Sequence, residues 1–142
     1  MRRVHPVLLL TVLATMIAVG CSRQPPPHVG EWDAQAYSEE KRFLGNASFH
    51  FFKDGDVQIG IEESSSPPDV REGEYRFDYS KNPITLDIGW KNGQSTVPYL
   101  YGIVQFVGER KDKMRIVYST KVRPSSFQAS EAFFWLTKKV NK

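Results

Sequence analysis

The chain has 142 residues, of which 40% are apolar and 25% are charged, and its net charge is +3. This length accommodates one domain, the composition is globular, and so small a net charge gives no support for nucleic-acid binding. The single cysteine excludes a disulfide within the chain. A multidomain enzyme, a disulfide-stapled scaffold and a polytopic membrane protein are therefore excluded.

The N-terminus has the pattern of a secretory signal peptide. Arg2 and Arg3 precede an apolar run, residues 7–19, that is shorter than the ~20 residues needed to span a bilayer. Small residues then lead to Cys21. This arrangement resembles the lipobox of bacterial lipoproteins. The resemblance implies that residues 1–20 are removed and that acyl chains on Cys21 attach the protein to a membrane.

Residues 21–29 are predicted to form a lipidated tether, followed by a domain over residues 30–142. The three consecutive prolines within the tether favour an extended polyproline II conformation. His28 is assigned to the tether. Ser22 follows the lipidated cysteine, and resemblance to enterobacterial lipoproteins implies an outer-membrane location facing the periplasm of the bacterial cell envelope.

The domain reads as about eight β-strands separated by turns. Residues 71–79 alternate most clearly, with glycine and aromatic residues on one face and charged residues on the other. An Asp-Gly pair at Asp54 and Gly55 indicates a β-hairpin. Residues 33–44 contain helix formers and predict one or two helical turns, or part of a long first connection. Short connections favour antiparallel neighbours, so we expect an all-β, up-and-down barrel of the lipocalin-like type.

Two sets of residues resemble a known family. Residues 30–32, Gly-Glu-Trp, resemble the Gly-x-Trp motif that opens the first strand of lipocalins. Residues 82–88 and 101–104, followed by Arg-Pro-x-x-Phe at 123–127, have the order and spacing of a small lipocalin-like domain common in planctomycetes. The resemblance covers residues 30–139. That family has no assigned biochemical function, so the resemblance implies a fold and no activity.

The motif residues, which include Gly30 at the start of the first strand, are predicted to have structural roles. We expect Trp32 to close one end of the barrel and Gly102 to mark a β-bulge or bend within a strand. Arg123 is expected to stack on an aromatic ring and to donate hydrogen bonds to backbone carbonyls at the barrel mouth. Pro124 would stiffen that loop, and Phe127 would anchor it by burial.

The sequence contains no recognisable catalytic, metal-binding or cofactor-binding motif, so we predict a non-enzymatic protein without metal or cofactor. His50, which lies between two phenylalanines, is assigned a structural or surface role. With Cys21 acylated, no thiolate is available for catalysis. An enzyme would need a buried carboxylate, for which Asp78 and Asp87 are the candidates if they turn inward.

Two functions remain open. The nine Phe, six Tyr and three Trp predict a filled barrel whose outer surface serves as a structural or protein-interaction module in the envelope. This is the leading interpretation. The alternative is that the barrel binds or carries a small apolar ligand, which rests on the resemblance of fold alone. A cavity of several hundred Å3 would favour the ligand. A filled interior with an exposed apolar patch would favour a protein partner. Nucleic acid is not an expected partner in either case.

Overall fold

A computed structural model describes residues 23–62, 67–91, 100–128 and 131–140. Within these ranges the chain contains no helix, and so none that is long and apolar enough to span a bilayer. It forms eight β-strands, as the sequence predicted: β1 (Gly30–Tyr37), β2 (Phe43–Phe51), β3 (Asp56–Ile61), β4 (Asp69–Asp78), β5 (Ile84–Trp90), β6 (Leu100–Val107), β7 (Lys113–Ser119) and β8 (Ala132–Lys138).

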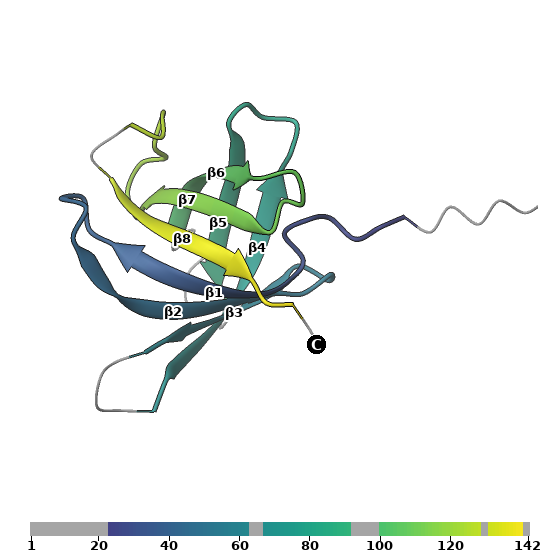
Figure 1. Ribbon diagram of the computed structural model, residues 1–142, viewed down its shortest axis with the longest axis horizontal. Helices are drawn as coiled ribbons and strands as arrows, with labels where there is room; N and C mark the ends of the chain where they lie inside the picture. The colour runs from purple at the N-terminus through teal and green to yellow at the C-terminus, as the bar shows by residue number, and fades with distance from the viewer. Residues whose placement is uncertain (1–22, 63–66, 92–99, 129–130, 141–142) are drawn as a thin grey trace, which may run out of the picture.

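The strands close into an antiparallel up-and-down barrel (Figure 1). Each strand pairs with the next in sequence, and β8 pairs with β1. The predicted fold is therefore confirmed. Closure leaves no free edge strand in the described barrel, so the backbone offers no row of unpaired amide and carbonyl groups to another chain.

The barrel interior follows the predicted alternation. Along β4, Gly73 is buried and Tyr75 and Phe77 pack against the core. Along β5, Leu86 and Ile88 are buried on the same interior side. The other fully buried large side chains come from six further strands: Trp32, Phe49, Phe51, Val57, Leu100, Met114, Ile116 and Leu136 among them.

The predicted helical turns within residues 33–44 are wrong. β1 continues to Tyr37 and β2 already begins at Phe43. A tight turn joins them, in which the Ser38 amide donates to the Arg42 carbonyl over 2.9 Å. Local helix propensity is a weak preference, and here the pairing of β1 with both β2 and β8 overrides it.

Gly102 does not form the predicted β-bulge. It pairs in continuous register with Leu86 of β5 and with Tyr118 of β7. A Cβ added there would lie 3.2 Å from Cγ2 of Ile116 and 3.3 Å from Cδ2 of Leu100. The glycine therefore permits close packing inside the barrel. The register shift that the structure does contain lies in β1, between Ala36 and Tyr37.

Candidate functional site

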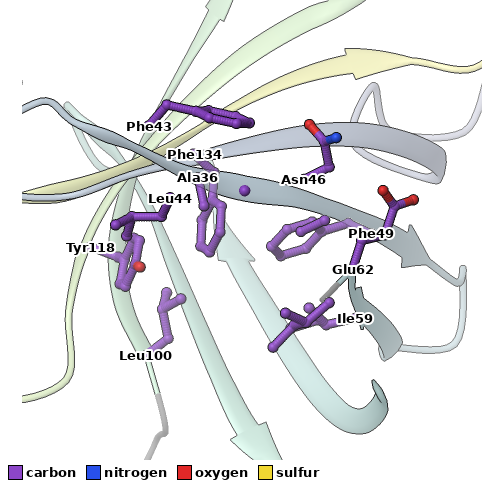
Figure 2. Close-up of a pocket in the computed structure, with 13 residues that line it drawn as sticks. Ala36, Phe43, Leu44, Asn46, Phe49, Ile59, Glu62, Leu100, Tyr118 and Phe134 are labelled. Atoms are coloured by element: carbon purple, nitrogen blue, oxygen red, sulfur yellow. The ribbon is translucent and has the colours of Figure 1, made fainter. Parts of the chain in front are cut away.

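One end of the barrel, hereafter the open end, contains a cavity of about 890 Å3. Its walls come from the end of β1, the start of β2, the end of β3 and the adjoining parts of β6, β7 and β8. Figure 2 shows the side chains of Phe49, Phe134, Tyr118, Leu100 and Ile59 arranged around one space. Most of the side chains that line this cavity are therefore apolar.

The cavity exists because small residues occupy inward positions at this end. Ala36 of β1 and Gly45 and Ala47 of β2 line it. Two large rings form its inner wall, where Phe49 and Phe134 meet edge to face with centroids 5.0 Å apart. Larger side chains at the three small positions would fill the space that the structure leaves between the strands.

Part of the rim of the cavity is also apolar. Phe43 and Leu44 are 56% and 64% exposed, and both line the cavity. Next to them Tyr37 stacks on Phe133 with centroids 4.7 Å apart and contacts the Phe43 ring edge to face. Exposed apolar side chains at the entrance of a cavity provide a path along which an apolar molecule can enter.

Two polar residues lie at the edge of the cavity, Asn46 and Glu62. Their backbones are joined by a hydrogen bond from the Glu62 amide to the Asn46 carbonyl over 3.1 Å. Figure 2 shows the Asn46 amide and the Glu62 carboxylate pointing away from the apolar side chains. These positions alternate with inward-facing Ala47 and Ile61, which explains why their side chains turn outward.

The interior of the opposite end of the barrel, hereafter the closed end, is packed with aromatic rings and His28. A second hollow, of about 740 Å3, lies beside them between residues 23–29, the β2–β3 turn and β4. Trp32 is fully buried, as the sequence predicted for a residue that closes one end, and its Nε1 donates to the His28 carbonyl over 2.8 Å. The His28 ring is stacked on Phe77 with centroids 4.1 Å apart. Only 5% of His28 is exposed. The histidine assigned to the tether is thus packed inside the barrel.

The hydrogen bonds of the His28 ring suit one neutral tautomer. The Tyr75 hydroxyl donates to the Phe52 carbonyl over 2.5 Å, so its oxygen accepts from His28 Nε2 at 3.1 Å. Nδ1 is then left as the acceptor for the Tyr79 hydroxyl at 2.6 Å. In this arrangement the imidazole is neutral and carries its proton on Nε2.

The electrostatics of the closed end agree with that assignment. Burial first, and then the positive charge of Lys138, together lower the pKa of His28 from 6.5 to about 4. Burial raises the pKa of Tyr79 to about 12, so its hydroxyl keeps the proton that it donates. At neutral pH the closed end therefore carries an uncharged hydrogen-bonded cluster.

Lys138 ties the segment before β1 to the end of β8. Its Nζ donates to the Pro27 carbonyl over 2.9 Å and lies 5.3 Å from the centre of the Trp32 ring. Gly30 makes this approach possible, because its φ is +124° and an added Cβ would lie 3.2 Å from Cε of Lys138. The segment that contains His28 is therefore held from both sides.

The Arg123 loop lies on the outer wall of the barrel. Arg123 donates to the Gly102 carbonyl over 2.9 Å and to Asp87 over 2.5 Å, and its guanidinium is 5.8 Å from the centre of the Tyr101 ring. Pro124 is buried. The partners are of the expected kinds, an aromatic ring and a backbone carbonyl, but none of these contacts lies in the cavity.

The remaining predicted residues take no part in the cavity. Phe127 is partly buried in the Arg123 loop, and His50 stacks on Phe52 with centroids 3.8 Å apart. Asp87 lies on the outer wall, where Arg123 donates to it. Asp78 lies at the surface, where hydrogen bonds from Ser80 lower its pKa. Neither candidate carboxylate therefore turns inward. Cys21, in contrast, lies outside the described residues.

Comparison with protein-family models, curated proteins and solved structures finds no match. The resemblance to a lipocalin-like domain therefore stays a prediction carried by its sequence motifs. The cavity and the closed end are the observations on which a function has to be argued.

Proposed function

We propose that the open end of the barrel binds a small apolar ligand, and that acyl chains on Cys21 hold the protein in the bacterial envelope. The observation that carries the first part is the cavity of about 890 Å3. This volume falls within the range of about 300–1,000 Å3 that is typical of small-molecule sites. Apolar walls of this kind stabilise a ligand by removing its surface from water.

The cavity changes the order of the two functions left open by the sequence. A filled barrel was the basis for a structural or protein-interaction module, whereas the open end is hollow. Phe43 and Leu44, which are neighbours and exposed, lie on the rim of the cavity. Their position suits an entrance at least as well as a docking surface, so ligand binding is the function that the geometry supports best.

Native mass spectrometry is the direct test of ligand binding. The chain from Ser22, which contains the complete barrel, would be purified from an envelope-exporting host and compared with its denatured mass. We expect a discrete extra mass that is lost on denaturation. A bare mass, combined with no saturable binding of the uncharged fluorophore N-phenylnaphthylamine, would contradict the proposal.

A substitution that fills the cavity gives the matched control. Ala36→Phe adds a ring inside the cavity, where space is present, so we expect probe binding to fall at least about tenfold while stability changes by less than about 1 kcal/mol. Gln105→Phe adds the same ring at an exposed position outside the cavity and should leave binding unchanged. Equal binding in both variants would place the probe elsewhere.

Lipid attachment is tested separately. The full-length chain, expressed in a bacterium supplied with an alkyne-tagged fatty acid, should incorporate the tag and sediment with membranes. Cys21→Ser should abolish both, because acylation requires the thiol. Tag incorporation that survives Cys21→Ser would contradict anchoring through this residue.

A further inference from the structure

In the part of the chain that the structure describes, the residues that line the cavity of the open end include no cation, which limits the charge that a bound ligand can carry. Among the described residues that line it, the only charged side chain is that of Glu62, and there is no lysine, arginine or histidine. A bound carboxylate, sulfate or phosphate group would therefore meet no cation on the cavity wall.

The three internal segments outside the described residues contain no cation that could change that count. Residues 63–66, 92–99 and 129–130 contain one charged residue, Glu63, and no basic residue. Wherever these segments lie, they can add negative charge to their surroundings and no positive charge.

The turn that leads into the rim brings no net positive charge. Residues 39–42 contain two acids followed by two bases, and Arg42 forms an ion pair with Glu40 over 2.5 Å. This turn is balanced in charge. Together, this turn and the residues that line the cavity carry one negative charge more than positive charges.

These observations bear on the chemistry of the ligand's polar group. Moving an anionic group from water to an apolar site is unfavourable unless a cation or several donors offset the loss of hydration. An uncharged hydroxyl or amide loses much less. We propose that the cavity selects uncharged amphiphiles, such as long-chain alcohols, and discriminates against anionic ones, such as fatty acids. This inference rests on the proposed ligand-binding function.

The test compares dodecanol, dodecyltrimethylammonium and dodecanoate, which share the same length of carbon chain and differ in the charge of the polar group. Each would displace N-phenylnaphthylamine from the protein below its critical micelle concentration, at about pH 8, where a carboxylic acid is ionised. We expect dodecanol to bind at least about tenfold more tightly than dodecanoate. The ammonium compound should bind about threefold more tightly than dodecanoate, because the two ions differ mainly in the sign of charge.

Glu62 provides the variant. Glu62→Gln removes the one charge on the cavity edge and should bring the affinities of the ammonium compound and dodecanoate closer together, with dodecanol unchanged. Glu109→Gln makes the same chemical change in the β6–β7 turn, away from the cavity, and should alter none of the three affinities.

Two outcomes separate this inference from the proposed function. Saturable binding in which dodecanoate equals or exceeds the ammonium compound would overturn the charge selectivity and leave ligand binding intact. Failure of the probe and of all three amphiphiles to bind would overturn both proposals.

Discussion

The closed and open ends of the barrel are built from the same eight strands and differ in what points inward. At the closed end Trp32, Phe51 and Phe77 surround His28, whose ring nitrogens are both hydrogen-bonded. At the open end Ala36 and Ala47 leave a cavity. The strands pair around the barrel at both ends, with a register shift at the open end between Ala36 and Tyr37. The distribution of large and small side chains therefore decides which end is filled.

This difference separates stability from binding within one small domain. The closed end combines buried aromatic area with satisfied polar groups, both of which stabilise the folded state. The cavity at the open end loses part of that packing, because its walls lack neighbours on one side. Substitutions at the closed end should therefore mainly change the free energy of unfolding, and substitutions at the open end should mainly change ligand affinity.

The largest effect is expected when an aromatic residue of the closed end is removed, compared with an aromatic residue of the open end. Trp32→Ala should lower the free energy of unfolding by about 3–5 kcal/mol, because it opens a cavity and removes the donor to the His28 carbonyl. Phe43→Ala, at a position that is 56% exposed, should lower it by less than about 1 kcal/mol. Urea unfolding followed by circular dichroism measures both.

If Trp32→Ala does not fold, Trp32→Phe provides a milder variant with an intermediate loss. A similar loss of stability for the Trp32 and Phe43 variants would contradict the difference between the two ends.

The second prediction concerns pH and the closed end alone. Folding lowers the pKa of His28 from 6.5 to about 4, so the unfolded chain takes up a proton first as the pH falls. This contribution to stability is complete above about pH 6.5 and is lost progressively down to about pH 4. Urea unfolding at several pH values should show this slope, and His28→Phe should reduce it.

His50→Gln is the matched control, because it removes the other histidine of the barrel, which sits at the surface near Glu31. Its slope should equal that of the unsubstituted protein. Identical slopes for the His28 and His50 variants would show that His28 is not the group responsible.

The smallest expected effect comes from a region that belongs to neither end. Asp87→Asn weakens the ion pair that holds the Arg123 loop on the outer wall, and both partners are about one-third exposed. We expect a loss of about 0.5–1 kcal/mol in unfolding free energy and no change in the affinity of N-phenylnaphthylamine. Altered probe affinity would show that this loop communicates with the open end.

The strands could be predicted from the sequence because their alternation is local. Residues 71–79 place glycine and aromatic side chains on one face, and that face is the interior. Residues 33–44 were harder to predict. Their alanine, glutamate and lysine residues favour a helix in isolation. The structure is decided instead by the pairing of β1 with β2 and with β8, and β8 lies about a hundred residues further along the chain.

The contents of the two ends could not be predicted from composition. The number of aromatic residues indicated a filled barrel, but aromatic residues lie at both ends, and the open end also has the small inward residues Ala36, Gly45 and Ala47. His28 was missed because its partners Tyr75 and Tyr79 lie 47 and 51 residues further along the chain. The available signal was indirect, since an inward-facing tyrosine hydroxyl needs a hydrogen-bond partner and the sequence contains few candidates.

The place where the N-terminal segment meets the barrel determines which end of the barrel would face a membrane that held Cys21. His28 is fixed in the closed end, and Cys21 precedes it by seven residues, a span of at most about 25 Å. In Figure 1 the chain before β1 and the end of β8 leave the barrel on the same side. A bilayer that held Cys21 would thus lie next to the closed end. The cavity would face away from that bilayer, and its ligand would arrive from the aqueous compartment rather than from the anchoring lipid.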